Sequence, residues 1–155
     1  MYCVIAFLII LFDQISKDIA RGHLRLGESL PIIKNFFHLS LVFNTGAAFG
    51  LFRNETIFFI LAACVAIIAI VRTLKFKIFY SNELSLESLS LILILAGAIG
   101  NLIDRIRFGY VVDFLDFRIW PVFNIADSSI TIGAILLVIA VFRESKKSKR
   151  VESRE

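Results

Sequence analysis

The sequence is poor in the residue types that build metal sites and disulfide frameworks. Its 155 residues include two cysteines and two histidines. Cys3 and Cys64 lie inside apolar runs, and neither has a companion at the spacing of metal ligands. The same holds for His23 and His38, which we interpret as interfacial side chains. The sequence therefore predicts neither a metal nor a cofactor, and it disfavours a serine triad because no histidine lies near Ser128.

Charged residues are also scarce, at 19% of the chain, whereas hydrophobic residues make up 58%. The mean hydropathy is +0.83. Soluble domains contain roughly 45–50% apolar residues even when glycine is counted. A chain of this size leaves much of its surface exposed, so one soluble core cannot hold this excess. The composition predicts an integral membrane protein.

Four apolar spans are long enough to approach the ~20 residues that cross about 30 Å of hydrocarbon. The first could be a cleavable secretory signal, but it lacks a basic N-terminal region and a small-x-small cleavage site. We therefore expect a retained helix that begins with almost no cytoplasmic extension. The prediction is an all-α integral membrane protein with four transmembrane helices, at residues 2–19, 57–71, 86–103 and 125–142.

The basic residues, which give a net charge of +4, gather at the ends of these spans. They form no stripe with interleaved aromatic residues, so we expect no nucleic-acid partner. The positive-inside rule places both clusters, and with them both termini, in the cytoplasm. Residues 143–155 are predicted to form a disordered, basic cytoplasmic tail. The clusters are Arg72, Lys75 and Lys77 after the second span, and Arg143, Lys146, Lys147, Lys149 and Arg150 after the fourth.

Two segments, at about 22–54 and 104–121, then face outward together. The first holds β-rich runs at 32–33 and 36–43, followed by a glycine-containing turn at 44–50. It predicts a small extracytoplasmic β-cradle. The second is rich in Val, Phe and Ile and contains Trp120, so we expect an interfacial segment between the last two helices.

Two aspartates, Asp113 and Asp127, lie between and against the last two spans. A carboxylate near the hydrocarbon boundary is costly, so such residues usually face a bundle interior or a wet cavity and act there. Two carboxylates brought close together cannot comfortably both ionise, so one holds a proton while the other accepts one from water. The pair predicts acid–base chemistry that activates a water for attack on an amide.

Two groups of polar residues near this pair allow a structural and a functional interpretation. Asn101, Asp104 and Arg105 share one helix face, either as a packing face with an interfacial ion pair or as part of a site. Asn124 and Asp127 share a face near the start of the fourth span, either as an N-terminal cap in which Asp127 only stabilises the first turn or as part of a site. Pro121, just before this span, is a candidate start signal.

Two further motifs stand away from the last spans. Asp13 and Lys17, four residues apart, are interpreted as a supporting ion pair that lowers the cost of both charges. Asn44 and Gly46 lie in a loop that either approaches a ligand closely or forms a simple turn.

Five blocks of the sequence resemble the bacterial lipoprotein signal peptidase family, also called signal peptidase II. They occur in family order and run from the first span to the start of the fourth. The blocks are Asp13-Gln14-Ile15-Ser16-Lys17, Phe43-Asn44-Thr45-Gly46-Ala47-Ala48-Phe49, Gly100-Asn101-Leu102-Ile103-Asp104-Arg105, Gly109-Tyr110-Val111-Val112-Asp113-Phe114 and Phe123-Asn124-Ile125-Ala126-Asp127.

The resemblance implies a single peptidase domain at residues 1–142, in the bacterial inner membrane, with its active site towards the outer face. Its substrates would be prolipoproteins that carry diacylglycerol, cut on the amino side of the lipobox cysteine, and its inhibitor would be the cyclic peptide globomycin. Membrane lipid is a further partner, and we expect a monomer. The implied catalytic residues are Asp113 and Asp127, with Asn44, Gly46, Asn101, Arg105 and Asn124 binding substrate and Asp13, Lys17 and Asp104 supporting them.

Three other functions fit parts of the pattern. A small transporter or proton relay could use the same carboxylates and would produce ion flux without peptide cleavage. A metal-dependent enzyme acting on lipid head groups would need further carboxylates at ligand spacing and would lose activity with a chelator. A non-catalytic scaffold explains the spans but not five ordered polar blocks.

Overall fold

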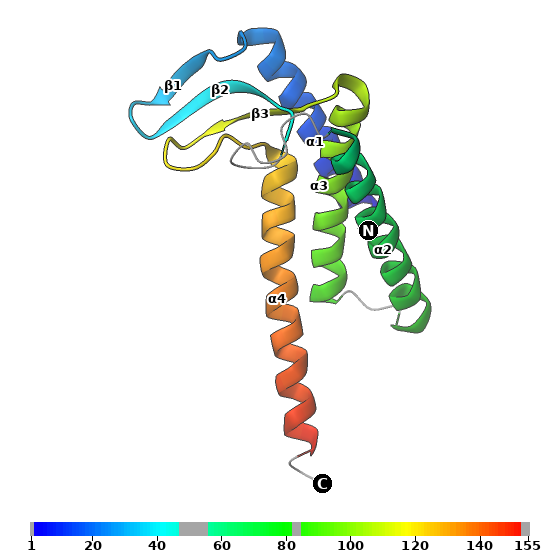
Figure 1. The fold of residues 1–155 in the computed structure, drawn as a ribbon. Helices are drawn as coiled ribbons and strands as arrows, with labels where there is room; N and C mark the ends of the chain where they lie inside the picture. The colour runs from blue at the N-terminus through cyan, green and yellow to red at the C-terminus, as the bar shows by residue number, and fades with distance from the viewer. Residues whose placement is uncertain (1, 47–55, 82–84, 153–155) are drawn as a thin grey trace.

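The computed structural model describes residues 2–46, 56–81 and 85–152, and it combines four helices with one small sheet (Figure 1). The described part of the turn predicted at 44–50 ends at Gly46, and the remainder lies outside the described residues. In chain order the elements are α1 (Tyr2–His23), β1 (Ser29–Ile33), β2 (Phe37–Asn44), α2 (Thr56–Ser81), α3 (Leu86–Phe108), β3 (Val111–Asp116) and α4 (Ile125–Glu152).

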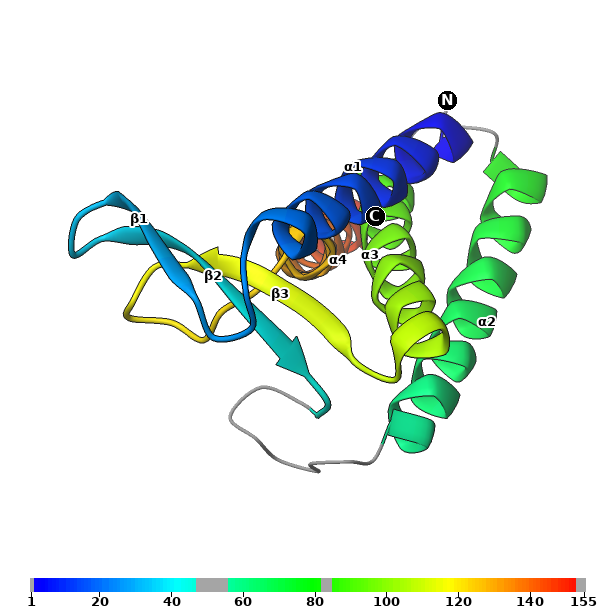
Figure 2. The same cartoon turned by 90° about the horizontal axis from the view of Figure 1, so that it is seen from above.

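Helix α3 is the centre of the bundle, because α1, α2 and α4 all contact it. Figures 1 and 2 show α4 alongside α3, α2 on another side of α3, and α1 crossing the bundle obliquely. Small residues allow α3 and α4 to approach closely. A Cβ atom at Gly97 would collide with the backbone oxygen of Ala126, and one at Gly133 would lie 2.8 Å from the backbone oxygen of Ser90.

The predicted small sheet is confirmed, with antiparallel strands in the order β1-β2-β3. Its buried core, formed by Leu41, Val112 and Phe114, packs with Ala20 of α1. The sheet therefore sits at the end of the bundle where α3 ends and α4 begins (Figure 1). Our interpretation of 104–121 as an interfacial segment missed β3, and residues 104–108 belong to α3.

Three helices in the described part of the chain are long and apolar enough to cross a membrane: Thr56–Lys77, Leu86–Phe108 and Ile125–Lys146. Their large apolar side chains are widely exposed, among them Ile57, Leu61 and Val65 on α2. Lipid would cover such a surface favourably. The predicted first span forms α1, but its crossing of the membrane stays a prediction, since α1 carries Asp13, Lys17 and a further acidic residue.

The helices extend beyond the predicted apolar spans. Helix α2 runs to Ser81 and α3 to Phe108, where Gly109 ends the helix with a φ of 80°. Helix α4 runs to Glu152, so the prediction of a disordered tail from Arg143 is wrong for the described part of that segment. Extending an existing helix avoids the cost of nucleation, and Arg, Lys and Glu favour helix. Charge therefore ends the membrane span without ending the helix.

Candidate active site

The two aspartates singled out in the sequence lie where the sheet meets the bundle. Asp113 is on β3, and Asp127 is in the first turn of α4. Asn124 links them, because its Nδ2 donates to Asp113 Oδ1 at 2.7 Å and its Oδ1 accepts the backbone N–H of Asp127 at 2.8 Å. Asp113 and Asn124 are fully buried. One asparagine therefore sets the position of one carboxylate against the other.

Asn124 is also the cap of α4. Asp127 Oδ2 accepts the backbone N–H of Asn124 at 3.3 Å, which completes a reciprocal arrangement of the capping-box type. The two interpretations of this motif are thus compatible, since the cap orients the side chain that bonds Asp113. Pro121 precedes α4, which begins at Ile125 directly after its cap.

Asn44 reaches the pair from the end of β2. Its Nδ2 donates to Asp113 Oδ2 at 2.9 Å, and its Oδ1 accepts the backbone N–H of Gly46 at 3.1 Å. The two strands bring these residues together, because Val42 of β2 is in register with Asp113 of β3. The turn at Gly46 therefore orients a side chain of the site.

Asn101 reaches the pair from α3. Its Nδ2 donates to Asp127 Oδ1 at 2.7 Å. Its Oδ1 accepts two hydrogen bonds, from Lys17 Nζ at 2.9 Å and from Asn124 Nδ2 at 3.1 Å. Asp113 thus accepts hydrogen bonds from two asparagine side chains, and Asp127 accepts one.

Beneath the pair lies a buried ionic cluster. Lys17 Nζ is 2.8 Å from Asp13 Oδ2 and 3.0 Å from Asp104 Oδ2. The carboxylates also hold the backbone, because Asp13 accepts the N–H of Ala126 at 2.9 Å and Asp104 that of Val112 at 3.0 Å. Val112 and Ala126 directly precede Asp113 and Asp127 in the sequence. The cluster therefore positions both segments that carry the pair, and removing one member would leave a buried charge unpaired.

Gln14 is a site residue that our sequence reasoning did not single out. Its Nε2 donates to Asp104 Oδ1 at 3.0 Å, to the backbone oxygen of Gly100 at 3.2 Å and to Asp13 Oδ2 at 3.2 Å. The available signal was an amide side chain between Asp13 and Lys17 in an otherwise apolar span. Gly100 keeps this contact close, because a Cβ there would lie 2.6 Å from Asp13 Oδ2.

Arg105 lies on α3, as Asn101 and Asp104 do, but its side chain is only partly buried. Its Nη1 is 3.5 Å from the backbone oxygen of Asn101, and its guanidinium is 5.2 Å from the ring centre of Phe59. Its charge interacts with Asp127 and Asp113. The guanidinium is thus a cation at the edge of the site.

Burial and the neighbouring charge of Asp127 raise the pKa of Asp113 to about 7. Hydrogen bonds from Asn44 and Asn124, and the charge of Lys17, oppose this shift without cancelling it. Asp113 is therefore poised to hold or release a proton near neutral pH. No group of three His, Cys, Asp or Glu side chains that could hold a metal ion occurs among the described residues.

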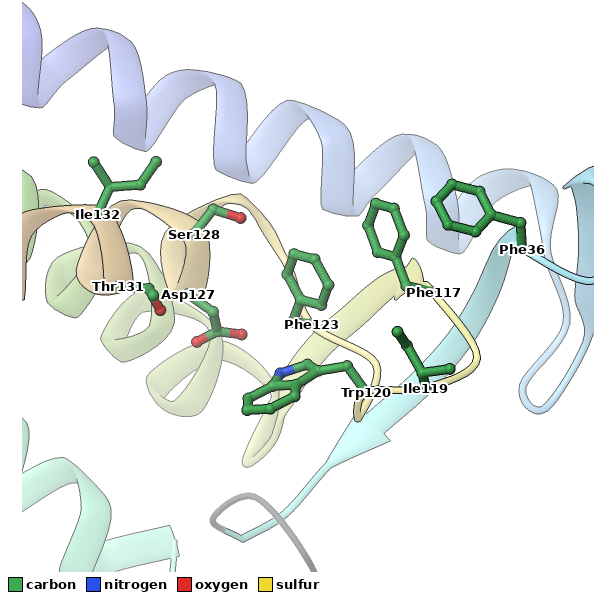
Figure 3. A pocket seen from close by; sticks show the side chains of 9 residues that line it. All are labelled: Phe36, Phe117, Ile119, Trp120, Phe123, Asp127, Ser128, Thr131 and Ile132. Carbon is green, nitrogen blue, oxygen red and sulfur yellow. The ribbon is translucent and has the colours of Figure 1, made fainter. Parts of the chain in front are cut away.

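Asp127 also borders an apolar groove of about 560 Å³ (Figure 3). Aromatic rings line the part beside the sheet, and α4 forms the other part. A water or amide next to Asp127 would thus have apolar surface on one side and hydrogen-bonding groups on the other. The lining residues are Phe36, Phe117, Ile119, Trp120, Phe123, Asp127, Ser128, Thr131 and Ile132.

The fold and site define a multi-pass membrane protein with a pair of carboxylates, one buried and one half-buried, beside an apolar groove. A family model described as signal peptidase (SPase) II matches residues 5–143. The chain belongs to the signal peptidase II family, a family of proteases.

Curated relatives and solved structures agree with this assignment. The chain is 45% identical over 146 residues to the lipoprotein signal peptidase of Halothermothrix orenii, covering 94% of this chain and 98% of that protein. It is 48% identical over 136 residues to that of Moorella thermoacetica, covering 88% and 89%. A bacterial membrane enzyme solved by the in meso method at 2.3 Å resolution is similar, with a TM-score of 0.85, 34% identity, and coverage of 94% of this chain and 90% of that one.

Proposed function

We propose that the protein is an aspartyl endopeptidase that removes the signal peptide from diacylglyceryl-modified prolipoproteins, cutting on the amino side of the lipobox cysteine. The observation that carries this proposal is the pair formed by the buried Asp113 and the half-buried Asp127, joined through Asn124. The relatives named lipoprotein signal peptidases support the substrate class.

In the proposed reaction, the ionised carboxylate takes a proton from water while the water oxygen bonds to the scissile carbonyl carbon. The protonated carboxyl gives its proton to the leaving nitrogen as the carbon–nitrogen bond breaks. The pair then holds one proton again, so protons balance and no other nucleophile is required. The raised pKa of Asp113 supports this chemistry near neutral pH.

The surroundings of the pair suggest how a substrate would lie. Arg105, Asn44, Gly46 and the other asparagines would hold the peptide backbone through hydrogen bonds. The apolar groove beside Asp127 would take acyl chains or apolar lipobox side chains, each buried CH₂ contributing about 0.8 kcal/mol. A globomycin-type peptide would compete for the same space.

For orientation, we propose the inner membrane, with the sheet and the aspartate pair towards its outer face. The basic residues near the end of α2 and along the end of α4 lie at the opposite end of the bundle from the sheet (Figure 1). The positive-inside rule supports a cytoplasmic position for that end and for both termini. We expect the monomer to be active.

The test is a cleavage assay on a diacylglyceryl-modified lipobox peptide with the full-length protein in lipid. We expect Asp113→Asn and Asp127→Asn each to lower kcat by at least about a thousandfold, because each removes one partner in proton transfer. Asp116→Asn is the matched control, since it makes the same change on β3 where the carboxylate bonds Ser40 and Arg118.

Wild-type cleavage should be blocked by globomycin and unaffected by a chelator. Cleavage by either variant at near wild-type rate would contradict the proposed pair. Loss of cleavage with chelator would favour a metal-dependent enzyme, and ion flux in proteoliposomes without cleavage would favour a proton relay.

A further inference from the structure

We propose that Lys17 is a positioning residue that orients the amide of Asn101 towards Asp127, and that the proton of the resting pair therefore sits on Asp113. This inference rests on the proposed aspartyl mechanism. It assigns different roles to the two aspartates, with Asp127 taking the proton from water and Asp113 giving one to the leaving nitrogen.

The hydrogen-bond partners of Asn101 determine the orientation of its side-chain amide. Lys17 Nζ and Asn124 Nδ2 both donate to its Oδ1, at 2.9 and 3.1 Å. An ammonium group has no acceptor, so only the oxygen of the Asn101 amide can face Lys17. The amide nitrogen must then face Asp127 Oδ1, 2.7 Å away. The buried ammonium group of Lys17 thus orients the Asn101 amide so that its nitrogen, a hydrogen-bond donor, faces Asp127.

The two carboxylates differ in the hydrogen-bond donors that they face. Asp113 lies on a strand and accepts bonds from two asparagine amides, those of Asn44 and Asn124. Asp127 accepts one asparagine amide that is polarised by Lys17, and one backbone N–H at the start of α4. A helix N-terminus stabilises negative charge by about 0.3–1 kcal/mol, and hydrogen-bonded chains polarise one another. The stronger stabilisation of charge is at Asp127.

The charged groups around the pair agree with this asymmetry. Lys17 faces it from α1, with Asp13 and Asp104 as its ion partners, and Arg105 faces it from α3. The charge of Arg105 interacts more strongly with Asp127 than with Asp113. The pKa of Asp113, raised to about 7 by burial and by the charge of Asp127, is a further supporting observation.

The direct test is a carboxyl titration of the full-length protein in detergent micelles, with carbon-13 in the side-chain carboxyls of its six aspartates. The signals of the pair are assigned by their disappearance in Asp113→Asn and Asp127→Asn. At a pH between the two titration steps, we expect an acid signal from Asp113 and a carboxylate signal from Asp127. The opposite assignment would overturn the inference.

The role of Lys17 is tested with the double variant Lys17→Met/Asp104→Asn, which removes one cation and one anion and so preserves the total charge of the cluster. The acidic limb of the kcat/KM profile should move to higher pH by about 1–2 units, because Asp127 loses the oriented donor. A variant with low kcat and unmoved limbs would mean that Lys17 only holds the fold together.

Two further variants complete the design. Asp18→Asn on α1, where Asp18 is 57% exposed and pairs with Arg21 at 3.9 Å, should leave the profile unchanged. If the double variant does not fold, Asn101→Asp replaces it, since it keeps the acceptor for Lys17 but turns an oxygen towards Asp127. It should move the acidic limb the same way. Cleavage retained in Asp113→Asn or Asp127→Asn would instead refute the proposed function itself.

Discussion

At the scale of single residues, Asn124 does two tasks with one side chain. Its oxygen caps α4 and its nitrogen bonds Asp113, so the start of the helix and the geometry of the aspartate pair are set together. Local spacing predicted that Asn124 and Asp127 share a face, but it left cap and site as alternatives. Only the contact with Asp113, on another element, shows that the two are combined.

Asp113 should also make stability depend on pH. Its pKa in the folded protein, about 7, is above the ordinary value of about 3.9 for an unfolded chain. The neutral form is favoured by folding, so its stabilisation is complete below about pH 4 and is lost as the pH rises through about 7. The free energy of unfolding should therefore fall with pH across this window, with a limiting slope of about 1.4 kcal/mol per pH unit.

Unfolding in micelles between pH 4 and 8 measures this slope. In Asp113→Asn the slope should be flatter than in wild type, because the amide does not ionise. Asp116→Asn, which leaves Asp113 in place, should retain it. An equal slope in wild type and Asp113→Asn would show that other groups control the pH dependence.

At the scale of elements, the strand that carries Asp113 was the main feature missed. Val111, Val112, Asp113 and Phe114 are all buried, so β3 has no alternation of apolar and polar residues to reveal it. The helices were found because their apolar spans are long, but their ends were underestimated. An apolar span ends where the chain leaves the membrane, whereas the helical backbone continues beyond that point.

The close approach of α3 and α4 predicts that alanine substitutions at two helical glycines, Gly97 on α3 and Gly22 on α1, affect stability differently. Gly97→Ala should destabilise the protein by about 1–3 kcal/mol, because the new Cβ collides with the backbone of Ala126, one residue from Asp127. Cleavage should fall with stability. Gly22→Ala on α1 is the control, since no atom lies within 4 Å of the added Cβ.

Thermal unfolding and the cleavage assay measure both glycine variants. Alanine in a helix is favoured over glycine by about 0.5–1 kcal/mol, so Gly22→Ala should be neutral or stabilising. Equal stability of the two variants would contradict the packing described for α3 and α4.

At the scale of the whole molecule, the groove is assembled from parts that are distant in the sequence. Phe36 lies between β1 and β2, Trp120 lies between β3 and α4, and Ile132 is on α4. The sequence predicted that Trp120 lies at an interface, and its side chain is 65% exposed. Its place beside Asp127 depends on how the sheet packs against the bundle (Figure 3).

Trp120→Ala should raise KM for a diacylglyceryl-modified peptide by about tenfold with a small effect on kcat, because it removes apolar contact rather than a proton-transfer group. Ile135→Ala is the control, since Ile135 is 56% exposed on α4 and does not line the groove. Steady-state cleavage kinetics measure both. A loss confined to kcat would contradict a binding role for the groove.

The sequence by itself determined the membrane setting, the two aspartates and the residue types around them. Apolar spans, and charged residues that are costly beside them, can be recognised from neighbouring residues in the chain. The tertiary structure alone decided which partners meet. Lys17 and Asn101 are 84 residues apart, and their contact exists because small residues let α1, α3 and α4 pack closely at one point. The direction of these hydrogen bonds depends on contacts between residues that are far apart in the sequence. No local pattern encodes such contacts.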